Sequence, residues 1–432
     1  MNPKITPITR RGFLGTTARI SAAAVPAFSI LAHSRGANFD RIRVGLVGCG
    51  GRGTGAARDA LLAGPNIELV AIGDILKMQV DACVDRLTKF RDSDGKPLPG
   101  LKVSPDKCFT GLDAYRRVID SGIDYVLLCT PPGFRPAHIE YAVSRGIHIF
   151  AEKPCATDPH GVRQILALEG EMKRKGIGLL SGFNGRHAFH YVDLVEALRA
   201  GEIGTIISMH AYFNTGDIWY RERPAGMPLP EYHFYNWFHV DWLCGDHLVE
   251  QHVHNLDRCN WIMGDHPIKA YGMGGRQYHT DRGGNIYDHF AVEFEYPNGV
   301  RMTSMCRQIK GTDAKVGEDI IGTKGTASTV GKGAVITGEK GRAFKEHPGQ
   351  QESHQQEHTD FIAALRRGEI PNDTRFLCES TLTAIMGRES AYTGKVVTWD
   401  EIMCSELRLV PENIAAWDGS LRPVPKPGMK RA

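Results

Sequence analysis

The sequence predicts an α/β protein with two domains: an N-terminal domain on a parallel sheet, and a C-terminal α/β domain with a largely antiparallel, open sheet. Three observations lead to this prediction. Apolar strand-like runs alternate with helical stretches from residue 42 to residue 181. A glycine-rich turn follows the first of these runs. From about residue 204 short strands follow one another, several of them joined by glycine turns.

The first strand–turn–helix unit is the most specific feature of the chain. A strand is expected over Ile42–Val47, followed by the turn Gly48-Cys49-Gly50-Gly51-Arg52-Gly53 and a helical pattern; a second strand, Ile67–Ile72, is followed by Asp74. A G-x-G-x-x-G turn between strand and helix, with an acidic residue about 20 positions further on, is the fingerprint of a dinucleotide-binding Rossmann unit. A purely structural glycine turn is the alternative.

Each residue of this turn has an expected role in binding NAD. Gly48 permits the tight turn, Gly53 permits close packing of helix on strand, and Gly50 lets backbone N–H groups approach a pyrophosphate. Gly51 and Arg52 belong to the same loop, where the helix N-terminus favours an anion. Asp74 would bind the ribose hydroxyls and repel a 2′-phosphate, which favours NAD over NADP.

The following strands bring further residues to the same edge of the sheet. A strand over Asp124–Cys129 is followed by Thr130-Pro131-Pro132, and after a helix over Phe134–Ser144 a strand over Ile147–Phe150 is followed by Glu152-Lys153-Pro154. Ligands of open parallel sheets bind beyond the carboxyl ends of the strands. We therefore expect Thr130, Pro131, Glu152 and Lys153 to contact the cofactor. Gly178–Ser181 is a further strand, and Arg186-His187 follows it.

The second half of the chain predicts the antiparallel sheet and its helices. Strands are expected over Ile206–Phe213, Ala270–Met273, Ala291–Tyr296 and Arg301–Gln308, with Asn298-Gly299 as a hairpin turn. Residues Gly338–His354 read as a polar loop, and Thr359–Arg367 and Glu379–Thr393 as helices. The expected domains are residues 37–155 for the Rossmann domain, 156–410 for the second domain and 411–432 for a tail.

The first 36 residues predict an export signal and a linker. Arg10-Arg11, followed by Phe13-Leu14 and a mildly apolar run, resembles a twin-arginine signal, which implies a periplasmic or extracytoplasmic protein. A basic tail is the alternative. The run is short and broken by Pro26, and no later segment reaches 18 consecutive apolar residues, so no membrane association is expected after export.

Composition narrows the function classes. The net charge is +3 in 432 residues, which gives no signal for nucleic-acid binding. The ten cysteines include no C-x-x-C pair, which argues against a zinc ribbon or a thioredoxin-like site. Small molecules therefore remain the expected partners.

The chain resembles the Gfo/Idh/MocA oxidoreductases, the relatives of glucose–fructose oxidoreductase and inositol dehydrogenase. The resemblance rests on the glycine turn, on Glu152-Lys153-Pro154 and on the segment from Gly245 to Asp257, and it covers the chain from residue 41 to about residue 400. It implies tightly held NAD(P), a sugar or cyclitol substrate, and a homo-oligomer, a dimer or tetramer, formed through the open sheet.

Lys153 and His254 are the expected catalytic residues. An ammonium group at the sheet edge can hydrogen-bond the oxygen whose carbon gives or receives hydride. Glu250, His254 and Asp257 fit the family pattern of an acid, a histidine and an acid, and on a helix they share one face. The resemblance implies that His254 relays the substrate proton and that Glu250 and Asp257 help bind or convert the sugar; the family usually has aspartate in place of Glu250.

Several alternatives stay open. If the segment is extended rather than helical, Glu250, His252 and His254 lie on one side and could hold a zinc-like ion, although hydride transfer needs no metal and we expect none. Arg186 and His187 lie near the expected substrate, where Arg186 binds either the substrate or a structural carboxylate. Trp237 offers a face for stacking on a sugar ring or for core packing.

The expected reaction is hydride transfer between bound nicotinamide and a sugar or glycoside. Export would leave no external pool of NAD, so each turnover would have to restore the cofactor. That condition fits a ping-pong oxidoreductase or, as the alternative, a glycosidase that works by oxidation, elimination, hydration and reduction. The family's glycosidases tend to lack the lysine of Glu-Lys-Pro, and Lys153 therefore favours the oxidoreductase. A non-catalytic NAD-binding scaffold is a third hypothesis.

Overall fold

A computed structural model describes residues 40–428 except residues 93, 332 and 340. The predicted export signal and linker, residues 1–36, lie outside the described residues. Within the described part of the chain no helix is both long and apolar enough to cross a membrane.

The N-terminal sheet has six parallel strands in the order β3-β2-β1-β4-β5-β6. Its central strands are buried along their whole length, as expected for a parallel sheet covered on both faces. The strand order reverses between β1 and β4, which is where such sheets bind ligands. The strands are β1 (Ile42–Val47), β2 (Ile67–Asp74), β3 (Cys108–Thr110), β4 (Tyr125–Leu128), β5 (His148–Ala151) and β6 (Leu179–Ser181).

Helices connect these strands, and capping residues define several of their ends. Gly146, with φ of 72°, ends α4 in the left-handed conformation that favours glycine. Asp158 caps α5 by accepting a hydrogen bond from the Gly161 amide at 2.8 Å. The helices are α1 (Gly51–Leu62), α2 (Lys77–Lys89), α3 (Ala114–Ile119), α4 (Arg135–Arg145), α5 (Pro159–Ala167) and α6 (Glu169–Lys175).

The second sheet has nine strands in the order β14-β13-β12-β11-β7-β10-β9-β8-β15. Only the central pair β7 and β10 is parallel; the other neighbours are antiparallel. The strands are β7 (Ile206–Thr215), β8 (Lys269–Gly275), β9 (His289–Glu295), β10 (Arg301–Gln308), β11 (Lys315–Gly322), β12 (Gly325–Val330), β13 (Gly333–Gly338), β14 (Arg342–Lys345) and β15 (Val397–Thr398).

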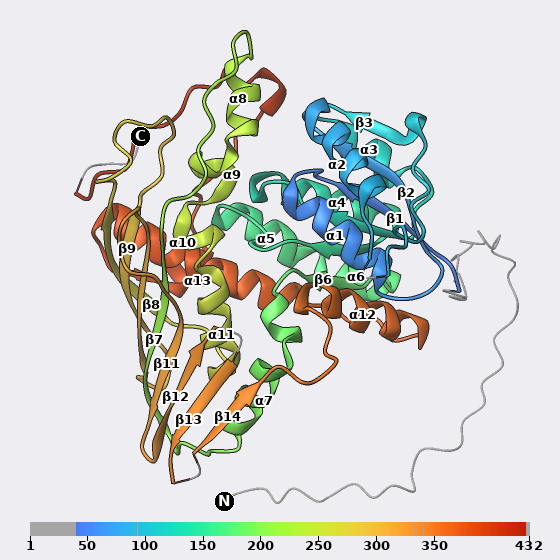
Figure 1. Ribbon diagram of the computed structural model, residues 1–432. Coiled ribbons are helices and arrows are strands. Elements are labelled where there is room, and N and C mark those ends of the chain that lie inside the picture. The colour runs from blue at the N-terminus through green and yellow to red at the C-terminus, as the bar shows by residue number, and fades with distance from the viewer. Residues whose placement is uncertain (1–39, 93, 332, 340, 429–432) are drawn as a thin grey trace, which may run out of the picture. The chain divides into compact units, whose positions relative to one another are not determined.

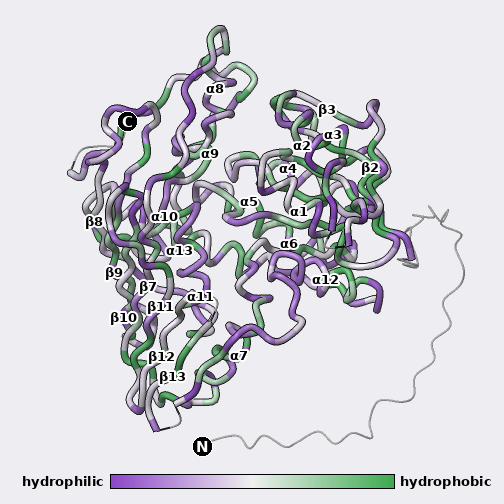
Figure 2. Tube along the Cα trace, in the orientation of Figure 1, coloured by the Kyte–Doolittle hydropathy of each residue, from purple (hydrophilic) through white to green (hydrophobic). Residues whose placement is uncertain are grey.

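Helices cover one face of this sheet (Figure 1). Both hydrophilic and hydrophobic residues occur along its strands (Figure 2). Buried and exposed positions alternate along β10, so one face is buried under α11 and α13, while the exposed face carries polar residues such as Arg301 together with the apolar Met273 and Met305. The mostly buried α13 also contacts β6 and α5, and thereby joins the two sheets. The helices are α7 (Phe189–Arg199), α8 (Leu229–Tyr235), α9 (Asp241–Cys244), α10 (His247–Glu250), α11 (Val253–Met263), α12 (Ser353–Arg366), α13 (Thr374–Thr393) and α14 (Trp399–Met403).

The fold class is confirmed, and two local predictions are wrong. The predicted polar loop Gly338–His354 contains the edge strand β14 and the start of α12. The segment from Glu250 to Asp257 is not one helix, because α10 ends at Glu250 and α11 begins at Val253. The first sheet also takes a strand, β6, from beyond residue 155, where the first predicted domain ends.

Candidate active site

The glycine turn leaves room for a dinucleotide on one side and none on the other. Gly48 has φ of 97°, and a Cβ on Gly53 would lie 1.8 Å from the Gly48 carbonyl oxygen. A Cβ on Gly50 or Gly51 would meet nothing within 4 Å. Since α1 begins at Gly51, the amides of its first turn have no intrahelical acceptors and face this open side. The turn therefore fits a pyrophosphate group.

Asp74 lies at the end of β2 and already helps to shape this turn. Its carboxylate accepts hydrogen bonds from the Cys49 amide at 2.7 Å and the Leu76 amide at 2.9 Å. Each oxygen keeps a second lone pair, and the side chain is only half-buried. Asp74 is thus placed to accept ribose hydroxyl groups, as the sequence predicts for an NAD-binding unit.

Arg52 connects the glycine turn to the second half of the chain. Its guanidinium pairs with Glu152 of the Glu-Lys-Pro segment, and it donates to Glu357 of α12 at 2.9 Å. Burial tends to raise the pKa of Glu152, but Arg52, Lys153 and Arg135 hold it below its ordinary value. Glu152 therefore stays ionised and pairs with Arg52, one of the contacts that the sequence could not specify.

A cavity of about 280 Å³ lies where this network meets the second domain. Its walls come from the carboxyl ends of β4 and β5, from the short α10–α11 connection and from α12. The segments between β7 and α8 and between α8 and α9 also contribute to the walls. The lining includes Arg52, Thr130, Glu152, Lys153, Trp237, Glu250 and His254, all of which the sequence predicts, and also Arg135, Trp219 and His354.

Lys153 and Glu250 form the polar centre of the cavity. The Lys153 ammonium donates to the Glu250 carbonyl oxygen at 2.5 Å and to its carboxylate Oε1 at 3.2 Å. The carbonyl is available because α10 ends at Glu250, so the interrupted helix provides an acceptor that a continuous helix would have used. Lys153 precedes a cis peptide bond to Pro154.

Glu250 and His254 are both poised for proton exchange. Burial raises the pKa of Glu250 to about 7 despite the opposing effect of Lys153, and among the described residues its Oε2 has no hydrogen-bond partner. Burial and the charge of Lys153 hold the pKa of His254 well below its usual value, so the imidazole is neutral. A neutral imidazole, an ammonium and a titrating carboxyl thus line one cavity.

Arg135 is a positioning residue that sequence reasoning missed. It is fully buried at the start of α4 and donates to the carbonyl oxygens of Thr130 and Pro154, so it ties the ends of β4 and β5 together. The signal available was the Pro131-Pro132-Gly133 turn, which forces the chain to start a helix at this edge. Pro131 itself is not among the cavity-lining residues.

The remaining predicted substrate residues have protein partners. Arg186 forms a two-pronged ion pair with Asp257, whose Oδ1 also accepts from Ser380 at 2.8 Å. His187 contacts Asp360 at 2.7 Å. None of Arg186, His187 and Asp257 lines the cavity. This geometry supports the structural role for Arg186 and gives no support to substrate binding by these three side chains.

The crowded histidines do not converge on a metal site. His252 is buried and contacts the Ser304 hydroxyl at 2.7 Å, whereas Glu250 and His254 line the cavity. Among the described residues, no three His, Cys, Asp or Glu side chains are grouped to hold a metal ion.

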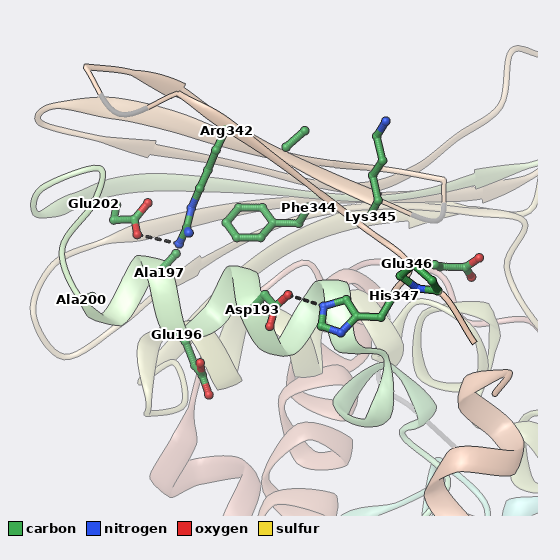
Figure 3. Close-up of a pocket in the computed structure, with 12 residues that line it drawn as sticks. Asp193, Glu196, Ala197, Ala200, Glu202, Arg342, Phe344, Lys345, Glu346 and His347 are labelled. Atoms are coloured by element: carbon green, nitrogen blue, oxygen red, sulfur yellow. Dashed lines mark hydrogen bonds and ion pairs between the residues drawn. The ribbon is translucent and has the colours of Figure 1, made fainter. Parts of the chain in front are cut away.

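A larger hollow, of about 680 Å³, lies away from these residues (Figure 3). It runs between α7 and the edge strand β14. Its opposing side chains are paired across it, with Arg342 donating to Glu202 at 2.7 Å and His347 contacting Asp193 at 2.8 Å. It contains none of the predicted site residues.

A Rossmann turn open to a dinucleotide, with proton-exchanging groups between it and a second open-sheet domain, defines a dinucleotide-binding oxidoreductase. Two family profiles agree: residues 42–177 match the "oxidoreductase family, NAD-binding Rossmann fold", and residues 191–328 match the "GFO/IDH/MocA C-terminal domain". The chain belongs to the Gfo/Idh/MocA family of oxidoreductases, and its N-terminal domain is an NAD-binding domain.

The named relatives match only part of this chain, at less than 30% identity. Inositol 2-dehydrogenase of Cereibacter sphaeroides is 29% identical over 170 residues, which are 39% of this chain and 44% of that protein. The dTDP-3,4-didehydro-2,6-dideoxy-α-D-glucose 3-reductase of Actinomadura kijaniata is 28% identical over 199 residues, 45% of this chain and 53% of the reductase. The matches thus span less than two thirds of these relatives.

A solved structure shares the fold. The aldose-aldose oxidoreductase of Caulobacter crescentus, complexed with glycerol, superposes with a TM-score of 0.66 at 15% identity. The comparison covers 83% of this chain and 99% of that one. At this identity the likeness shows the fold alone.

Proposed function

We propose that this protein is an NAD(H)-dependent oxidoreductase that oxidises or reduces a carbinol of a sugar, glycoside or cyclitol and holds its cofactor tightly. The observation that carries the proposal is the Lys153–Glu250 pair, which lines one cavity with His254 and with Arg52 of the glycine turn. The relatives named for inositol and for a deoxysugar support this substrate class.

The residues divide the work as follows. The glycine turn and Asp74 would hold NAD, which would supply the hydride acceptor or donor. Lys153 hydrogen-bonds the reacting oxygen, and neutral His254 or ionised Glu250 takes its proton. Trp237 and Trp219 supply flat apolar surface, suited to the C–H face of a sugar ring.

The test is to purify the protein, identify any bound nucleotide after denaturation, and then measure reduction of bound or added NAD with a panel of hexoses, inositols and their keto forms. We expect bound NAD(H) and turnover with at least one member. A preparation that neither contains nor binds NAD would refute the proposal.

The twin-arginine motif favours a second candidate, the glycosidase that regenerates its own NAD. Both candidates begin with the same oxidation, but only the glycosidase cleaves a glycosidic bond. Incubation with nitrophenyl glycosides in the absence of an acceptor separates them. Continuous nitrophenol release without accumulation of NADH would assign the glycosidase, and its absence alongside sugar-dependent NAD reduction would assign the oxidoreductase.

The pKa of Glu250 predicts the pH dependence of the oxidation. Below pH 7 the carboxyl is protonated and cannot accept a proton, so kcat/KM should rise with pH and level off above an apparent pKa of about 7. Because Glu250 and Lys153 interact, this value belongs to the pair. In Glu250→Gln the rise of kcat/KM with pH around pH 7 should disappear. An unchanged rise would assign that pKa to another group.

We also propose export by the twin-arginine route, with Arg10 and Arg11 as its determinants. In a bacterial host with this pathway, wild-type protein should reach the periplasm in folded form. The double variant Arg10→Lys/Arg11→Lys should stay in the cytoplasm, as shown by fractionation and immunoblotting. Equal periplasmic amounts of both would contradict the proposal.

We further propose that the outer face of the nine-stranded sheet is a homo-oligomer interface. The strand registers place Met273, Ala291 and Met305 opposite one another on neighbouring strands, and Met273 and Met305 are 63% and 39% exposed. Charges here would have to be desolvated in an interface. Met273→Asp/Met305→Asp should therefore reduce the mass measured by light scattering to that of a monomer; a wild-type monomer would refute this.

A further inference from the structure

A second cavity adjoins the candidate active site. It has a volume of about 340 Å³ and lies between α7, the ends of β7 and β11, and α12. His254 and His354 line both cavities, so the second begins on the far side of the proposed proton relay. The ring of His254 contacts Phe183 edge-on, at 5.9 Å between ring centroids.

The second cavity belongs to neither the glycine turn nor the edge of the first sheet. Its lining contains no residue from Gly48–Gly53 and none from the ends of β4 and β5. None of the predicted dinucleotide-binding residues lines the second cavity, so it is open to a part of the substrate remote from the reacting carbon.

The lining suits a second polyhydroxylated ring. Tyr191 and Phe213 provide aromatic surface, and Asn184, Gln350 and Ser353 provide neutral hydrogen-bonding groups. The Asn184 amide donates to the Ser353 hydroxyl at 2.8 Å, which joins the turn before α7 to the first residue of α12. Aromatic faces combined with neutral donors and acceptors match the apolar and hydroxyl surfaces of a sugar.

The charges of the lining exclude a nucleoside diphosphate. Its one guanidinium, that of Arg258, lies 2.7 Å from the buried carboxylate of Glu318. Glu346 and Glu352 add carboxylates, and burial lowers the pKa of His190, which leaves that ring neutral. A diphosphate would bring two negative charges into a lining whose guanidinium is already paired with Glu318. An uncharged unit meets no such penalty.

We infer that the substrate has two ring units: a reacting sugar or cyclitol beside Lys153 and His254, and an uncharged glycosidically linked sugar in the second cavity. This inference rests on the proposed function and specifies its substrate class. Contacts to the remote unit would supply binding free energy that orients the reacting carbon.

The test compares single rings with two-ring compounds in the holoenzyme. Glucose, galactose and myo-inositol are measured against cellobiose, lactose, galactinol and UDP-glucose, with NAD reduction as the readout. Val316→Trp is designed to fill the second cavity from a lining position on β11 that is 44% exposed. Val396→Trp, 53% exposed and outside both cavities, is the matched control.

We expect the best two-ring substrate to exceed its single ring in kcat/KM by about tenfold, which corresponds to ~1.4 kcal/mol. Val316→Trp should remove that advantage and leave single-ring turnover unchanged, and Val396→Trp should change neither. Equal use of one and two rings, preference for UDP-glucose, or an unaffected Val316→Trp variant would overturn the inference while the proposed function stands. If bound NAD is reduced by no compound, the proposed function fails as well.

Discussion

Lys153→Ala should reduce turnover by ~10³-fold while leaving bound NAD(H) in place, since positioned acid–base groups contribute about 10²–10⁴-fold. The ammonium lies beside Glu250 and not in the glycine turn, so its loss removes the group that contacts the reacting oxygen without opening the dinucleotide site. The measurement pairs steady-state kinetics with the nucleotide content of the purified variant.

A control lysine lies outside the cavity: Lys269, whose side chain is 42% exposed. Lys269 also forms an ion pair with a glutamate, to Glu295 at 2.8 Å, but it lies on β8 away from the cavity. Lys269→Ala should retain wild-type turnover. A Lys153→Ala variant with near-normal kcat would place the chemistry elsewhere, and one that loses NAD would show that the expected contact of Lys153 with the cofactor is needed to hold it.

The first half of the fold was predictable because its signals are local. Strand Ile42–Val47, the glycine turn and the strand that ends at Asp74 occupy adjacent positions, and the burial of a parallel strand shows directly as an apolar run. The hairpin at Asn298-Gly299 joins β9 and β10 for the same reason. Such elements need no knowledge of distant contacts.

The structure of the segment around Glu250 could not be predicted from local sequence signals. Neither a continuous helix nor an extended strand was correct, because α10 and α11 are separated at Gln251-His252. Asp246, at a φ of 78°, fixes the start of α10 through its buried carboxylate, which accepts from the Tyr287 amide at 2.8 Å. That contact joins residues far apart in sequence, so periodicity could not reveal it.

Arg135 and Glu357 were missed for a related reason. Arginine and glutamate are seldom fully buried, so nothing in a single sequence marks them as interior residues. Their burial follows from tertiary partners: carbonyl groups at two strand ends for Arg135, and Arg52 for Glu357. By contrast, Lys153 and His254 were predictable because family resemblance assigns their positions.

The glycine turn separates structural from binding roles, and two single substitutions should show this. In Gly53→Ala the new methyl group would overlap the Gly48 carbonyl oxygen at 1.8 Å. The backbone on both sides is fixed by β1 and α1, so the turn has to distort. We expect a loss of ~3 kcal/mol in the free energy of unfolding, the upper range for over-packing, together with loss of NAD.

Gly50→Ala should also lose NAD binding but should leave the stability of the fold almost unchanged. Its Cβ meets no protein atom within 4 Å, and its φ of −66° and ψ of −174° suit alanine, so the fold should lose less than ~1 kcal/mol, the cost of alanine at a helix N-cap. The methyl would instead occupy the open side where the pyrophosphate approaches the α1 amides. Denaturant unfolding of the NAD-free proteins should therefore separate the variants by stability, whereas titration with NAD should show binding lost in both. Full NAD affinity in Gly50→Ala would mean that the dinucleotide does not cross this side of the turn.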